Sequence, residues 1–150
     1  MKESTGSSVA SLPASSKVLC GCYAAIALVA LVATWSQNIA YLGVPGTLFA
    51  FFQDLTVTPA SRSFSADLML VFLAAAILMA VEARKHSIRF VWWYIIAGLV
   101  IAISVTFPLF LIARELKIAG TSPSELRSAD AVLLASLAAG TVAVMLWIVV

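Results

Sequence analysis

Long apolar runs, separated by short polar segments, dominate this chain. They predict membrane-spanning helices over about residues 18–36, 62–84, 90–113 and 130–150, because roughly 20 apolar residues cross the core of a bilayer. A shorter apolar segment over 48–55 predicts a helix that cannot span and lies in the interface or dips in from one side. The pattern predicts an all-α fold: an integral membrane four-helix bundle with a short interfacial or re-entrant helix after the first span.

The first 17 positions are rich in serine and have no apolar periodicity. We expect residues 1–17 to form a disordered N-terminal tail, and residues 18–150 to form a single transmembrane domain. A cleaved signal peptide is the alternative for the first run. The run ends in the sequence TWSQN over 34–38, which lacks the small-x-small pattern of a cleavage site, so we expect it to remain as a span.

Local signals mark several helix starts. Thr58 and Pro59 suit the cap and first position of the second long helix. Ser122 to Glu125 reads as a capping box before the fourth span. Val44 to Gly46 suits a turn, after which Thr47 caps the short helix.

The third run is the longest and carries two further signals. Trp92, Trp93 and Tyr94 form an aromatic belt at its start, where the rings sit at headgroup level. Pro108 lies within the run and cannot donate to the Ser104 carbonyl, so the sequence predicts a kinked helix there.

Composition restricts the classes of function. The chain is 63% hydrophobic and 11% charged, whereas soluble domains carry about 25% charged residues. A net charge of +2 gives no basic surface for nucleic acid. Cys20 and Cys22 are too few for a disulfide framework or a zinc site. His86 is four residues after Glu82, which favours a pair on one helix face. We therefore expect no metal, no cofactor and no nucleic-acid partner.

Four spans would place the N-terminus, the connection over 82–89 and the C-terminus on one side. Lysines and arginines divide five against four between the two sides. Arg84, Lys85 and Arg89 crowd one short connection, so the positive-inside rule favours cytoplasmic N- and C-termini.

The same topology predicts one polar cluster, either a ligand site or a structural network. Asn38 ends the first span, Asp67 lies near the start of the second, and Arg114 and Glu115 end the third. We expect these four residues to reach the same membrane face. A carboxylate in an apolar zone needs a cation or several donors, so Asp67 and Arg114 are predicted to be neighbours.

FPLFLIARE over 107–115, preceded by WWYIIAG over 92–98, resembles a family of small bacterial membrane proteins catalogued as domain of unknown function 2834. Asn38, the ADL over 66–68 and the EAR over 82–84 are similar to its pattern. The resemblance covers about 18–115 and implies a multi-pass protein of the bacterial inner membrane. It implies no activity.

Two functions remain open. The first is a non-enzymatic bundle that binds or stabilises a membrane protein partner, a second copy of itself or a lipid, because no catalytic constellation is present. The second is a small transporter, a proton-linked channel or a lipid- or isoprenoid-modifying enzyme with a polar site around Asp67. An ionisable residue inside a span is a functional candidate.

Overall fold

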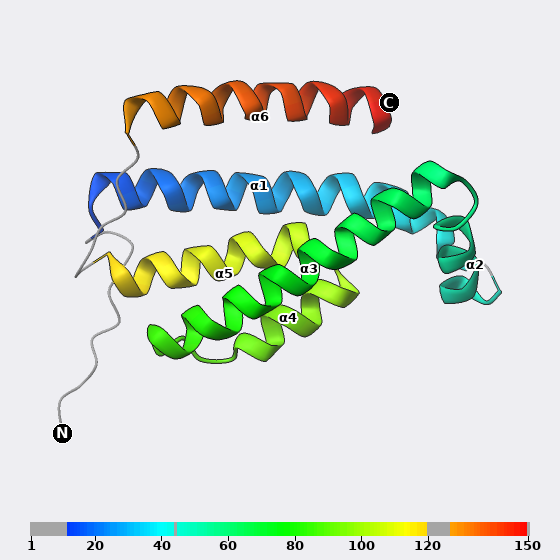
Figure 1. The fold of residues 1–150 in the computed structure, drawn as a ribbon, viewed down its shortest axis with the longest axis horizontal. Helices are drawn as coiled ribbons and strands as arrows, with labels where there is room; N and C mark the ends of the chain where they lie inside the picture. Colours follow the sequence, from blue (N-terminus) through cyan, green and yellow to red (C-terminus); the bar gives the residue numbers. More distant parts are fainter. Residues whose placement is uncertain (1–11, 44, 120–126, 150) are drawn as a thin grey trace.

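The computed structural model describes residues 12–43, 45–119 and 127–149, and within these residues the fold is entirely helical. The predicted all-α class is therefore confirmed. The elements are α1 (Ala14–Asn38), the 3-10 helix η2 (Ile39–Tyr41), α2 (Thr47–Asp54), α3 (Pro59–Lys85), α4 (Val91–Val100), α5 (Ile103–Ile118) and α6 (Ser128–Val149). Figure 1 shows α1 beside α5, α3 crossing α5 obliquely, α4 on the side of α5 away from α1, and α6 apart from them.

Three helical segments in the described chain are long and apolar enough to cross a membrane. They are Ala14–Tyr41, Pro59–Lys85 and Ser128–Ile148. Large hydrophobic side chains are exposed along all three, as expected where lipid tails rather than water surround the helices. The segments are compatible with embedding in a membrane.

The first helix begins four residues before the predicted span. Pro13 occupies the N-cap position and α1 starts at Ala14. Residues 14–17 are therefore helical and do not belong to a tail. Other predictions concern residues outside the described part of the chain: the tail over 1–11, Val44 in the turn, and the capping box over 122–125.

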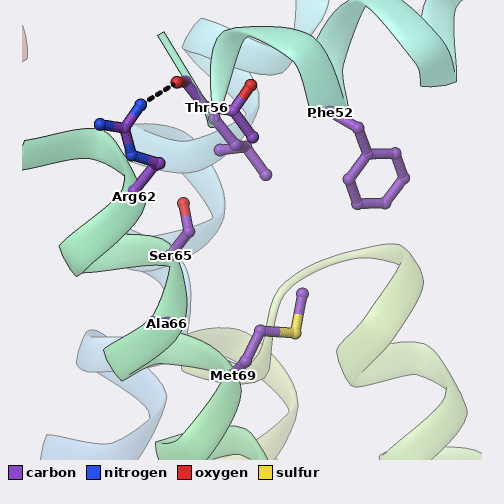
Figure 2. A pocket seen from close by; sticks show the side chains of 7 residues that line it. Phe52, Thr56, Arg62, Ser65, Ala66 and Met69 are labelled. Carbon is purple, nitrogen blue, oxygen red and sulfur yellow. Dashed lines mark hydrogen bonds between the residues drawn. The ribbon is translucent and has the colours of Figure 1, made fainter. Parts of the chain in front are cut away.

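The start of α3 agrees with the sequence. The Thr58 hydroxyl accepts from the Ser61 backbone N–H, the Ser61 hydroxyl accepts from the Thr58 N–H, and Pro59 holds the first helical position. These bonds satisfy two backbone donors that a helix start leaves free. One turn on, Arg62 Nη1 donates to the Thr56 carbonyl oxygen over 2.8 Å (Figure 2), which ties α3 to the segment after α2.

The short helix predicted over 48–55 is present as α2. Gly46 precedes it with a φ of 74°, a left-handed conformation that glycine adopts without steric cost. Eight residues extend only about 12 Å, so α2 is too short to span. The structure does not confirm that α2 is interfacial or re-entrant.

The prediction of one continuous helix over 90–113 is wrong. The chain leaves the helical path at Ile101 and Ala102, and α4 and α5 are separate helices. Gly98 approaches Thr106, and the ring of Tyr94 contacts that of Phe110 with centroids 5.8 Å apart. In each pair, the two residues lie the same number of positions before and after residue 102. The helices α4 and α5 therefore form an antiparallel hairpin. At 10 residues, α4 is about 15 Å long, half the thickness of a bilayer core.

A helix-ending motif directs the chain from α3 into this hairpin. Ser87 has a φ of 52°, and the Ile88 N–H donates to the Ala83 carbonyl oxygen over 2.8 Å. This is the bond of a Schellman motif, with serine where glycine is usual. Ile88 then packs against the core of α3, α4 and α5. The motif starts α4 at the same end of the molecule where α3 stops.

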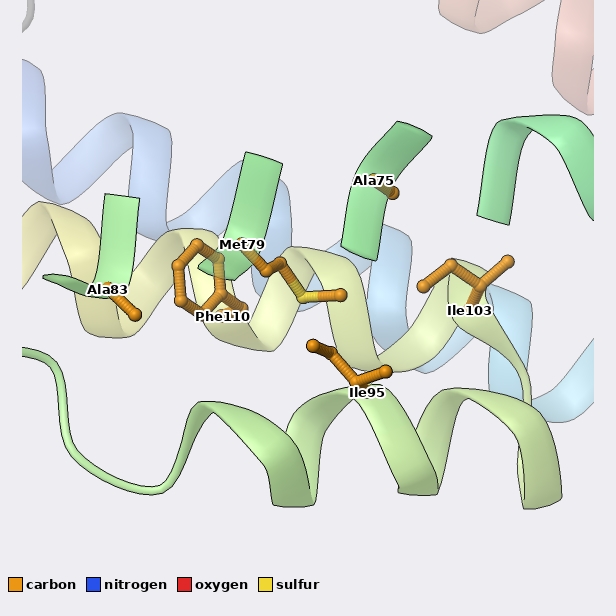
Figure 3. Close-up of a cluster of buried hydrophobic side chains, with 6 residues drawn as sticks. All are labelled: Ala75, Met79, Ala83, Ile95, Ile103 and Phe110. Atoms are coloured by element: carbon orange, nitrogen blue, oxygen red, sulfur yellow. The ribbon is translucent and has the colours of Figure 1, made fainter. Parts of the chain in front are cut away.

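The core is centred on α5. Figure 3 shows six buried side chains meeting between three helices: Ala75, Met79 and Ala83 from α3, Ile95 from α4, and Ile103 and Phe110 from α5. Phe110 and Met79 are completely buried. On the opposite face of α5, Val105 packs on two alanines of α1, Ala27 and Ala30, whose small side chains permit close helix contact.

Pro108 is buried inside α5, and the helix continues through it. The reversal of the chain therefore lies six residues before the proline, at Ala102. A bend at Pro108 itself stays a prediction.

The fourth predicted span corresponds to α6. None of its described side chains is buried, and it lies apart from the core in Figure 1. A four-helix bundle is therefore not confirmed.

The hairpin predicts the accessibility of its two ends. In a chain with Cys20 and Cys22 replaced by serine, Ser87→Cys and Lys117→Cys should react with a membrane-impermeant maleimide from the same side of sealed vesicles. Val57→Cys, at the other end of α3, should react only from the opposite side. Reaction of Lys117→Cys on the Val57 side would mean that the third apolar run crosses the membrane.

The close approach at Gly98 predicts a packing cost. A Cβ added there would lie 2.9 Å from Thr106 Oγ1 and 3.3 Å from Ile103 Cδ1. Gly98→Ala should lower the free energy of unfolding, measured in mixed micelles, by about 1–3 kcal/mol, as overpacking does. Gly140→Ala is the control because nothing lies within 4 Å of that position. Equal effects of the two changes would show that the hairpin tolerates a wider separation.

Candidate functional site

The four residues predicted to form one polar cluster lie at two ends of the molecule. Asn38 ends α1 and Asp67 is in the third turn of α3, beside α2. Arg114 and Glu115 lie near the C-terminal end of α5. We call the first region the α2 end. The opposite region, where α1 begins and α3 and α5 stop, is the charged end (Figure 1).

The predicted contact between Asp67 and Arg114 is wrong. Arg114 Nε donates a hydrogen bond to Glu82 Oε2. Glu82 is 15 residues after Asp67, about 22 Å farther along α3. The cause is the α4–α5 hairpin, which returns α5 to the end of the molecule where α3 stops. A continuous third helix would have carried Arg114 to the other end.

Glu82 is the centre of an ion-pair network at the charged end. Besides Arg114, its carboxylate lies 3.9 Å from Lys85 Nζ and 3.4 Å from His86 Nε2. The predicted pairing of Glu82 with His86 on one helix face is therefore confirmed. The Glu82 side chain is 13% exposed and that of Arg114 29% exposed. The pair joins α3 to α5, and its two side chains are partly shielded from solvent.

A second polar contact joins α5 to α1. The Ser16 hydroxyl donates to Glu115 Oε1 over 2.8 Å. Ser16 is fully buried and Glu115 is 2% exposed. A buried carboxylate is stable only when donors compensate for its lost hydration. Because α1 begins at Ala14, Ser16 lies within the helix, and its hydroxyl faces Glu115 of α5.

At the charged end, these polar side chains form contacts between helices. Two adjacent residues of α5 act in different directions: Arg114 binds α3 and Glu115 binds α1. His86 Nε2 lies close to Glu82 but makes no hydrogen bond to it or to any other described group. Within the described residues, no group of three or more His, Cys, Asp or Glu side chains is placed to hold a metal ion. The arrangement fixes the ends of three helices against each other.

The α2 end is organised differently. The Tyr41 hydroxyl donates to Asp54 Oδ2 over 2.7 Å, and the Thr47 hydroxyl donates to the Tyr41 carbonyl oxygen over 3.0 Å. Asn38 is half-buried and Asp67 is exposed. Within the described residues, the Asp67 carboxylate has no hydrogen bond or ion pair, so α3 presents an uncompensated carboxylate on its outer surface.

Sequence reasoning missed the two partners that complete the charged end. The spacing of Glu82 and His86 drew attention to Glu82, but nothing local connects it with Arg114, 32 residues later. Ser16 lies in a serine-rich stretch and carries no distinguishing signal. Both contacts depend on the direction of α5, which the apolar pattern did not give.

The network predicts coupling between Glu82 and Arg114. Glu82→Gln and Arg114→Gln should each lower the free energy of unfolding by about 1–3 kcal/mol, because each leaves a shielded charge without its partner. The double variant should cost less than the sum. The matched control pairs Asp67→Asn with Arg114→Gln and should be additive within about 0.5 kcal/mol. Coupling in the control, and none in the first cycle, would contradict this geometry.

Comparison with known proteins gives one match. The model of the family described as "Protein of unknown function DUF2834" matches residues 22–116. No curated protein matches the chain, and no solved structure does. The matched region extends from α1 through Glu115, and it includes both the hairpin and Arg114. Because it covers more than half of the sequence, the chain belongs to this family of unknown function.

Proposed function

We propose that this protein is a non-enzymatic, multi-pass protein of the bacterial inner membrane that binds or stabilises a membrane partner or a lipid. The observation that carries the proposal is the carboxylate of Asp67. It is exposed on a helix apolar enough to span. Ionisable residues in such segments pair with one another or face a protein interior or water. A cation or a hydrogen-bond donor from a partner membrane protein would pair with the Asp67 carboxylate.

The charged end supports a non-enzymatic role. Glu82 and Arg114 pair with each other, and the Ser16 hydroxyl donates to Glu115. These contacts hold the helices against one another, so the geometry of these four side chains serves helix packing. Groups held in this way would have to break structural contacts before they took part in a reaction.

The distribution of charge supports an orientation in the membrane. Of the eight lysines and arginines in the described residues, seven lie at or near the charged end: Lys17, Arg84, Lys85, Arg89, Arg114, Lys117 and Arg127. Among the described residues, Arg62 alone lies at the α2 end. The positive-inside rule then favours a cytoplasmic charged end, with the start of α1 inside. If α6 also crosses the membrane, its C-terminal end lies outside, which revises the expectation that both termini share the cytoplasmic side.

A second candidate function uses the same carboxylate. A small transporter, a proton-linked channel or a lipid- or isoprenoid-modifying enzyme would need an ionisable group that is not consumed by structural pairing. Asp67 meets this condition, since Arg114 pairs with Glu82 and not with Asp67. In that case Asp67 would exchange protons or contact a substrate, and its replacement would abolish turnover or proton movement without changing the proteins bound.

Crosslinking at the Asp67 face tests the partner. A photoreactive amino acid at Leu70, which is exposed and one turn from Asp67, should give a discrete protein adduct in native membranes. Asp67→Asn should largely abolish the adduct because it removes the charge that a partner cation would bind. Asp67→Glu should retain it.

Asp54→Asn is the matched control, because this carboxylate is already engaged by Tyr41, and it should leave the adduct unchanged. An adduct that persists in Asp67→Asn would contradict the proposed contact. Proton uptake by reconstituted vesicles that Asp67→Asn abolishes, with no protein adduct, would establish the second candidate instead.

A further inference from the structure

A groove at the α2 end lies between α2 and the first turns of α3. It has a volume of about 270 Å³ and is lined by Phe52, Leu55, Thr56, Arg62, Ser65, Ala66 and Met69. Figure 2 shows Phe52 and Met69 on opposite sides of the groove and Arg62 at one end of it. Because α3 is apolar beyond this point, the groove extends from the polar end of the helix toward the membrane core.

The lining residues from α3 form one stripe. Arg62, Ser65, Ala66 and Met69 are spaced three, four and seven residues from Arg62, which places them on the same helix face. The stripe is about 10 Å long at 1.5 Å per residue. Its polar part is at the helix start and its apolar part lies deeper. This polarity matches a phospholipid, whose phosphate stays at headgroup level while its acyl chain extends inward.

Arg62 supplies the cation that selects an anionic headgroup. Its guanidinium has five N–H donors, and one nitrogen, Nη1, is bound to the Thr56 carbonyl oxygen. That bond fixes the side chain toward the groove and leaves donors for the paired oxygens of a phosphate, a geometry that arginine favours. Among the described residues, no other lysine or arginine lies at the α2 end. Of the nearby carboxylates, Asp54 accepts a hydrogen bond from Tyr41 and Asp67 does not line the groove, so neither occupies the remaining donors of Arg62.

We propose that this groove binds one anionic phospholipid, with its phosphate on Arg62 and one acyl chain between Phe52 and Met69. The site refines the proposed binding function by naming a lipid class. It involves a different face of α3 from the Asp67 contact, so either can fail while the other holds.

Native mass spectrometry of the purified full chain tests the site. The protein in mild neutral detergent is titrated with phosphatidylglycerol or phosphatidylcholine carrying identical dioleoyl chains. We expect the first phosphatidylglycerol to bind about fivefold more tightly than phosphatidylcholine, the difference that one cation near an anionic surface provides. Arg62→Gln should remove this preference, because phosphatidylglycerol then loses more affinity than phosphatidylcholine, whose choline cation already balances the charge of its phosphate.

Two further variants define the site. Arg89→Gln removes an exposed arginine at the charged end and should keep the preference. Ala66→Phe fills the groove and should weaken the binding of both lipids. Equal binding of the two lipids by the unaltered chain, or an equal loss in Arg89→Gln and Arg62→Gln, would overturn the proposal. A dimer that Ala66→Phe dissociates would overturn it in favour of a second copy of the chain in the groove.

Discussion

At Ala102 an extended residue interrupts a run of apolar helix, and the two halves fold back on each other. The reversal is possible because Gly98 has no side chain at the point where α4 meets α5. It brings Phe110 between α3 and α4, while Val105 remains available to the alanines of α1. One helix, α5, thereby contacts three others. The cluster around Phe110 depends on the reversal, because it combines residues of α4 and α5.

The same reversal determines which charges meet. It returns Arg114 and Glu115 to the end where α3 stops and α1 begins, so the two residues find Glu82 and Ser16 there. The reversal also places most of the lysines and arginines at the charged end. Four straight spans divide the lysines and arginines almost evenly between the two sides, whereas the hairpin moves Arg114, Lys117 and Arg127 to the side that already holds Arg84 and Lys85. The charge asymmetry and the buried contacts thus have a common geometric origin.

Much of the fold could be predicted from local sequence. The Thr58 cap, the helix after Gly46 and the long apolar segments follow from residue chemistry and hydrophobic length. The hairpin could not be predicted this way. Ile101 and Ala102 are neither glycine nor proline, and in a membrane both the inner and outer faces of a helix are apolar, so periodicity does not reveal a turn. Pro108 is the obvious irregularity in the run, yet the reversal lies six residues earlier.

The candidate site shows the same division between local and long-range information. Sequence alone identified Glu82, Arg114, Glu115 and Asp67 as charges that need an explanation, but assigning partners required the direction of α5. Once that direction is known, the four residues fall into two groups, those with a partner inside the protein and the one without. Three are compensated inside the protein, at a junction that holds helix ends together. Among the described residues, Asp67 has no such compensation, and it faces outward, where the cost of a carboxylate falls only with a headgroup, water or a partner's cation beside it. The structural use of Arg114 is therefore what leaves Asp67 available for binding.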